Sequence, residues 1–112
     1  MQICDAGDVA IVPFPFTDMA VAKPRPALAL STQAANAASG NTIFAMITTA
    51  ARSDWPQDVP IRETRSAGLT TASIVRVKLF TLDNRVVSRT IGRLGTQDRA
   101  AVRRMLRSLI AI

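Results

Sequence analysis

The stretch Gly7-Asp8-Val9-Ala10-Ile11-Val12-Pro13-Phe14-Pro15-Phe16-Thr17-Asp18, followed by Pro24-Arg25-Pro26-Ala27-Leu28-Ala29-Leu30-Ser31, decides how this chain folds. It holds two apolar runs, 8–14 and 27–31, each short enough for one β-strand and each bordered by proline. A short polar loop joins them. The pattern predicts two neighbouring strands of a small β-structure, with the loop at its mouth.

Arg25 stands between Pro24 and Pro26 at the start of the second run. Proline fixes its own backbone angle and pushes the preceding residue out of the helical region, so the three residues form a stiff, extended segment. The guanidinium carries a permanent charge and a planar set of donors that suits phosphate oxygens. Arg25 is therefore a candidate phosphate-binding residue; the alternative is an ordinary solvated loop arginine.

The rest of the first two thirds predicts strands and turns. After a turn signal at Ser39-Gly40-Asn41, strand-like runs occupy 42–49, 59–62 and 73–77. Segment 50–56 is irregular, and Asp83-Asn84 marks a bend.

The last residues predict a helix that Thr96 can cap. Apolar residues recur at three- and four-residue spacing, at Val102, Met105, Leu106, Leu109 and Ile110. Arginines occupy the other positions, at Arg99, Arg103, Arg104 and Arg107. We expect the apolar face to pack on the strands; the alternative for a basic amphipathic helix is a membrane surface.

Composition bounds the class of protein. The 112 residues suit one domain, 1–112, and a hydrophobic content of 48% leaves apolar surface for a dimer interface. The net charge is +6, and residues 52–112 carry twelve basic side chains against five acidic ones. Such a surface favours a polyanionic partner: nucleic acid, an anionic membrane or an acidic protein segment. The alternative is a genomic base bias toward arginine.

Several classes of site are excluded by residues that the chain lacks. It has no histidine, and Cys4 is its only cysteine. An intramolecular disulfide, a His/Cys zinc cluster and a catalytic triad with an imidazole base are therefore impossible. We see neither a signal-peptide pattern nor a membrane-spanning apolar run, so we expect a cytoplasmic protein without a membrane partner.

Five segments together carry a family resemblance: GDVAIVPFPFTD (7–18), KPRPALALS (23–31), MITTA (46–50), AGLTTASIVRVKLFTLDNR (67–85) and IGRLGTQDRAAVRRMLRSLI (91–110). In this order and spacing the chain resembles the PemK/MazF/Kid toxins of type II toxin–antitoxin modules. The resemblance implies a mainly β fold with a C-terminal helix, a small SH3-like β-barrel of the MazF/CcdB type. It also implies a homodimeric endoribonuclease, an mRNA interferase that cleaves single-stranded RNA without metal or other cofactor. An acidic cognate antitoxin would cover the basic surface, and operator DNA would be bound only by the toxin–antitoxin complex.

The resemblance also assigns roles to single residues. Arg25 matches the family's catalytic arginine, Thr48 its catalytic threonine, and Arg76 an arginine that takes part in cleavage in the Kid-like branch. Arg25 would stabilise the phosphate, while Thr48 would bind a non-bridging oxygen or orient the attacking 2′-hydroxyl. In a regular strand Thr49 would point to the opposite face from Thr48.

Five residues are predicted to contact RNA: Thr17, Lys23, Thr49, Arg52 and Lys78. The loops 16–23 and 51–56 would determine which RNA sequence is recognised. No metal ligand is expected.

Two departures from the family pattern leave the general base unassigned. Lys78 stands where the Kid-like branch has an aspartate, and the loop before Arg25 has no carboxylate after Asp18, the nearest acidic candidate. Two other functions therefore stay open. One is a CcdB-like toxin that binds DNA gyrase without catalysis. The other is a catalytically weak relative that binds antitoxin or operator DNA.

Overall fold

The computed structural model describes residues 2–15 and 23–112. Thr17, predicted to contact RNA, and Asp18, the nearest acidic candidate for the base, lie outside the described residues.

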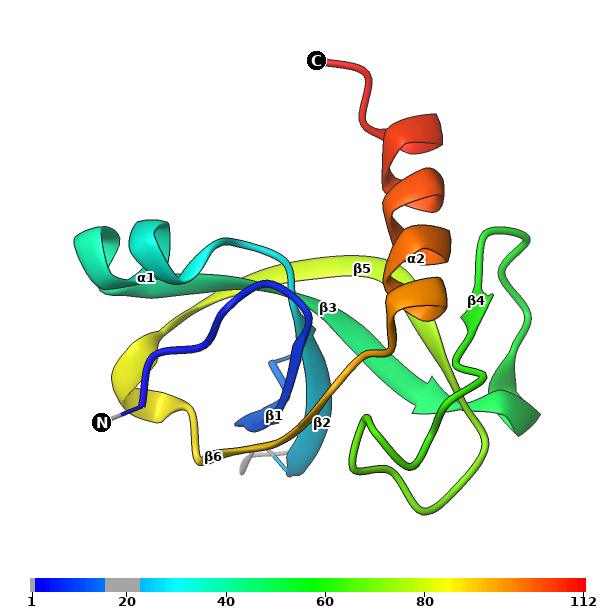
Figure 1. Ribbon diagram of the computed structural model, residues 1–112, viewed down its shortest axis with the longest axis horizontal. Helices are drawn as coiled ribbons and strands as arrows, with labels where there is room; N and C mark the ends of the chain where they lie inside the picture. Colours follow the sequence, from blue (N-terminus) through cyan, green and yellow to red (C-terminus); the bar gives the residue numbers. More distant parts are fainter. Residues whose placement is uncertain (1, 16–22) are drawn as a thin grey trace.

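Six antiparallel strands form one strongly curled sheet (Figure 1). The strands are β1 (Asp8–Pro13), β2 (Pro24–Ala29), β3 (Asn41–Thr49), β4 (Val59–Pro60), β5 (Ser73–Asp83) and β6 (Arg89–Arg93). Their order in the sheet is β4-β5-β3-β2-β1-β6. Two helices, α1 (Gln33–Ser39) and α2 (Thr96–Leu109), and two short 3-10 turns, η1 (Ala50–Arg52) and η2 (Asn84–Val86), complete the fold. The predicted small β-barrel with a C-terminal helix is confirmed in this curled sheet.

The curl of the sheet buries both sides of its central strands. Val9 and Ala10 are neighbours on β1, and neither is exposed to solvent, although their side chains point to opposite faces. Val9 packs in a cluster that includes Val102 and Met105 of α2. Ala10 packs in a second cluster, in which the Phe44 and Phe80 rings stack with their centroids 5.8 Å apart. The near-continuous apolar run of β1 is explained by these two cores.

Helix α2 packs through part of its predicted apolar face, but Leu109 and Ile110 are exposed, and Ile110 follows the last helical residue. Val102 and Met105 are buried, whereas Arg103 and Arg104 are exposed. The carboxylate of Asp98 in the first turn is also buried and accepts hydrogen bonds from backbone N–H groups of residues 62 and 63. The helix is therefore attached to the chain before β5 as well as to the sheet.

The start of α2 differs from the expectation. Gly95 occupies the N-cap position without a side-chain hydrogen bond, and Thr96 is already the first helical residue. No helix of the described residues is long and apolar enough to cross a bilayer.

Two elements were not expected from the sequence. Helix α1 has only seven residues and no apolar period, but Thr32 caps its start and Gly40 ends it in the left-handed conformation. Its Asn36 is fully buried and donates to the carbonyl oxygens of Cys4 and Ser31. Strand β6 has no strong strand pattern of its own and exists because it pairs with β1.

Candidate functional site

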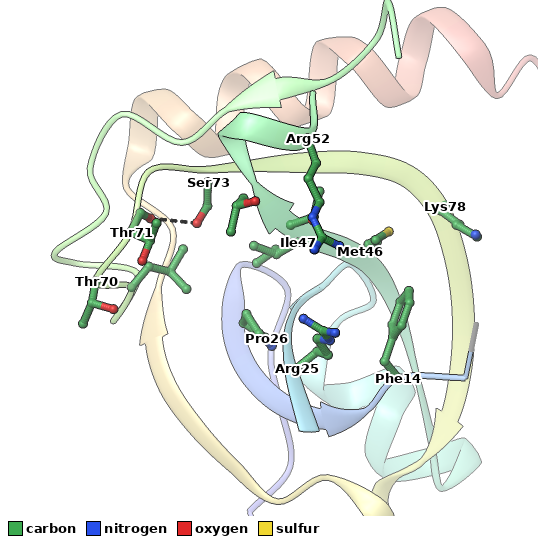
Figure 2. A pocket seen from close by; sticks show the side chains of 13 residues that line it. Phe14, Arg25, Pro26, Met46, Ile47, Arg52, Thr70, Thr71, Ser73 and Lys78 are labelled. Atoms are coloured by element: carbon green, nitrogen blue, oxygen red, sulfur yellow. Dashed lines mark hydrogen bonds between the residues drawn. The ribbon is translucent and has the colours of Figure 1, made fainter. Parts of the chain in front are cut away.

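A pocket of about 430 Å³ opens where β2, β3 and β5 meet η1 and the segment before β5 (Figure 2). Its lining combines cationic and hydroxyl-bearing side chains. The cationic ones are Arg25, Arg52 and Lys78, and the hydroxyl-bearing ones are Thr48, Thr49, Thr70, Thr71 and Ser73. Within the described part of the chain, no carboxylate lines this pocket. The arrangement suits an anion that accepts many hydrogen bonds, such as a phosphodiester.

The sheet register leaves Arg25 at the open end of β2. Arg25 pairs with Val12 of β1, but the pairing of β2 with β3 begins only at Ala27. Arg25 is therefore exposed on the side of the missing partner, and its guanidinium faces the pocket in Figure 2. No carboxylate in the ranges 2–15 and 23–112 forms an ion pair with it. The charge is available to a ligand.

Thr48 and Thr49 end β3, opposite Ile74 and Ser73 of β5. Both threonines border the pocket, whereas strict alternation along the strand predicted that only one would. The difference arises because Thr49 is the last residue of the strand, and the pocket wraps around the strand end into η1.

A bulge separates two cations of β5 that a regular strand would place on one face. Met46 lies opposite Arg76 and Ala45 opposite Leu79, so Val77 and Lys78 have no counterpart on β3. Lys78 lines the pocket, whereas Arg76 is not among its lining residues. Bulges of this kind re-aim side chains next to functional sites.

Two nitrogens of the Arg76 guanidinium donate hydrogen bonds to neighbouring acceptors. Its Nε and Nη2 donate to Asp58 at 3.1 and 2.9 Å, and Nη2 also donates to Asp54 at 2.9 Å and to the carbonyl oxygen of Arg52 at 3.1 Å. Its Cζ lies 4.8 Å from the centre of the Trp55 ring. The Arg76 side chain is 11% exposed and that of Asp58 only 3%. The Arg76 hydrogen bond holds the pKa of Asp58 below its usual value, and Asp58 in turn raises the pKa of Arg76.

The predicted site residues thus fall into three groups. Arg25, Thr48, Thr49, Arg52 and Lys78 come together around one pocket. Lys23 is exposed and Arg76 is held by carboxylates, and neither lines that pocket. Thr17 is outside the described residues.

Sequence reasoning did not select Thr70, Thr71 and Ser73 as site residues. Ser73 Oγ donates to the carbonyl oxygen of Thr71 at 2.8 Å, which orders the hydroxyl-rich wall of the pocket (Figure 2). The sequence feature that could have selected these three residues is the cluster of hydroxyl side chains just before a strand.

Fold and pocket together define a class: a small curled β-sheet protein whose strand ends line a pocket with cationic and hydroxyl-bearing side chains. Residues 5–110 match the family model described as PemK-like, MazF-like toxin of type II toxin–antitoxin system. The chain belongs to this family of toxins. No curated protein sequence matches it significantly.

Solved structures with the same fold include MazF from Deinococcus radiodurans, with 23% identity, all of both chains covered and a TM-score of 0.79. A MazE–MazF structure from the same organism has 25% identity, 99% coverage of each chain and a TM-score of 0.79. A third is an endoribonuclease in complex with its cognate antitoxin from a mycobacterial species. It is 16% identical, covers 96% of this chain and 93% of its own, and has a TM-score of 0.73.

Proposed function

We propose that this toxin is a metal-independent endoribonuclease that cleaves single-stranded RNA. The observation that carries the proposal is the meeting of Arg25 and Thr48 at one cationic pocket. The mycobacterial structure of the same fold is described as an endoribonuclease, which supports the same activity here. A CcdB-like gyrase toxin needs no such pocket, and no feature of this one favours that alternative.

In the proposed reaction the 2′-hydroxyl oxygen attacks the adjacent phosphorus, and the bond from phosphorus to the 5′-oxygen breaks. The leaving 5′-oxygen takes up a proton from solvent, so the products are a 2′,3′-cyclic phosphate and a free 5′-hydroxyl. Arg25 would stabilise the charge that develops on the phosphoryl oxygens, and Thr48 would donate a hydrogen bond to one of them. Arg52 and Lys78 would neutralise neighbouring phosphates. Asp18 stays the acidic candidate for accepting the 2′-hydroxyl proton.

The partners follow from charge and from the related complexes. We propose that an acidic cognate antitoxin covers the basic surface, because a solved structure of the same fold is an endoribonuclease in complex with its cognate antitoxin. Operator DNA would be bound by that complex only. A homodimer would cover exposed apolar side chains such as Leu109 and Ile110. We place this activity in the cytoplasm, where its RNA substrates are.

The test is incubation of the purified protein with a long single-stranded RNA in the presence of a metal chelator. We expect fragments with cyclic phosphate and 5′-hydroxyl ends. Arg25→Ala and Thr48→Ala should each lower the rate by about 100-fold or more, the loss typical of a removed oxyanion donor.

Arg104→Ala is the matched control for Arg25→Ala, because Arg104 is an exposed arginine on α2 outside the pocket. Its cleavage rate should equal that of the wild type. Intact RNA after incubation with folded wild-type protein would refute the nuclease, and gyrase inhibition by that protein would establish the binding toxin instead.

A further inference from the structure

Arg76 ties one irregular segment of the chain to the sheet. Between η1 and β4 the chain runs through residues 53–58 without a regular element. Arg76 on β5 donates four hydrogen bonds to three points along this segment and its start: the carbonyl oxygen of Arg52, Asp54 and Asp58. One guanidinium therefore fixes both ends of the segment.

The charge around Arg76 argues against a direct role at the RNA phosphate. Two carboxylates already accept its hydrogen bonds, and the pair with Asp58 is largely buried. A phosphate brought to this guanidinium would meet both aspartates, and like charges at such distances repel. The Nε and Nη2 donors of Arg76 are occupied by hydrogen bonds within the protein.

Arg52 connects the hydrogen bonds of Arg76 to the pocket. Its carbonyl oxygen is held by Arg76 while its own side chain lines the pocket, and Figure 2 shows its guanidinium reaching toward Arg25. Holding the backbone of Arg52 limits where its long side chain can go. A pre-positioned arginine loses less conformational entropy when it binds.

We propose that Arg76 is a positioning residue, which clamps residues 52–58 through Asp54 and Asp58 and so holds Arg52 in the pocket for an RNA phosphate. This role rests on the proposed function, but the clamp itself can be observed without RNA. Arg76 does not touch the scissile phosphate.

The first experiment follows Trp55, the only tryptophan of the chain, which packs on the clamped guanidinium. Arg76→Met and Asp58→Asn should each increase acrylamide quenching of its fluorescence, because the segment loosens. Arg76→Lys should not restore the wild-type signal, since an ammonium lacks the planar set of donors. Asp54→Asn, at a largely exposed carboxylate, should give a smaller change in a folded protein. Arg104→Met should give none.

The second experiment measures the salt dependence of binding to a single-stranded 2′-deoxy oligonucleotide, which lacks the attacking hydroxyl and stays intact. Arg52→Met should reduce the steepness of the log–log plot by about 0.7, one phosphate contact on a single strand. Arg76→Met should reduce the steepness by the same amount. The double variant, Arg52→Met with Arg76→Met, should reduce it no further than either single variant. Asp58→Asn should also weaken binding, although it removes a negative charge. In RNA cleavage, Arg76→Met should raise KM and leave kcat nearly unchanged.

The results that would contradict the positioning role, the clamp and the proposed function can be told apart. Any of three results would overturn the positioning role and assign Arg76 to the substrate. The first is that the salt effects of Arg52→Met and Arg76→Met add in the double variant. The others are tighter oligonucleotide binding by Asp58→Asn and a loss of kcat at constant KM in Arg76→Met. Unchanged Trp55 quenching in both Arg76→Met and Asp58→Asn would overturn the clamp itself. Wild-type protein that neither binds the oligonucleotide nor cleaves RNA would overturn the proposed function, and the quenching data would then still report whether the clamp exists.

Discussion

Two glycines of this molecule show how the need for glycine at a position depends on the atoms around it. Gly40 and Gly68 both have positive φ, +78° and +74°, a conformation that glycine adopts without strain. Beside Gly40 nothing lies within 4 Å of where a Cβ would be, whereas beside Gly68 a Cβ would collide with the backbone carbonyl of Ile91. Gly68 therefore allows the chain before β5 to lie directly against β6.

We predict different costs for the same substitution at these two positions. Gly40→Ala should lower the free energy of unfolding by about 1 kcal/mol, the cost of a left-handed alanine. Gly68→Ala should lower it by about 3 kcal/mol or more, because the steric conflict adds to that strain. Urea denaturation of both variants measures the difference, and equal losses would refute the close approach at Gly68.

At the scale of the element, α2 is held by few contacts of two kinds. Met105 is 7% exposed in the core cluster, and Asp98 fastens the first turn to the backbone before β5. Arg103, Arg104 and Arg107 are exposed, whereas Arg99 is half-buried and lies beside Gly7. The helix thus combines an apolar anchor with a polar one.

Replacing the apolar anchor should destabilise the whole fold. Met105→Ala removes buried methylene groups and leaves a cavity, so the free energy of unfolding should fall by about 2–5 kcal/mol. Arg104→Ala, an exposed neighbour on the same helix, should change it by less than about 0.5 kcal/mol. Thermal unfolding followed by circular dichroism makes the comparison. Similar midpoints for both variants would mean that α2 is not part of the cooperative core.

At the scale of the whole molecule, a net charge of +6 acts together with three cations of the pocket, Arg25, Arg52 and Lys78. Distant charges steer a polyanion toward the surface, and close ones release counterions from it. Both effects weaken when salt screens the charges.

We therefore predict that binding of a single-stranded 2′-deoxy oligonucleotide weakens steeply with salt. If each pocket cation neutralises one phosphate, a plot of log affinity against log salt should have a slope of about −2. Fluorescence anisotropy between low and moderate salt measures it. A flat response would contradict the anion-binding assignment of the pocket.

Most of the strands and the amphipathic helix could be predicted from the sequence, because their patterns depend on neighbouring residues along the chain. Arg25 could also be selected, since the prolines beside it act locally. Helix α1 could not be predicted, because it is held in place by a buried asparagine that donates a hydrogen bond to the backbone near the N-terminus. The surroundings of Arg76 could not either, since Asp54 and Asp58 lie far from it along the chain.

The amino-acid sequence by itself determined the strand-rich order of elements, the packing face of α2, the stiff backbone at Arg25 and the basic charge. Only the tertiary structure decided that β6 pairs with β1, that a bulge in β5 sends Lys78 to the pocket, and that Arg76 turns to two aspartates. Local backbone preferences act between neighbours in the chain and can be recognised there. Register, bulges and ion pairs depend on which distant segments the folded core brings into contact.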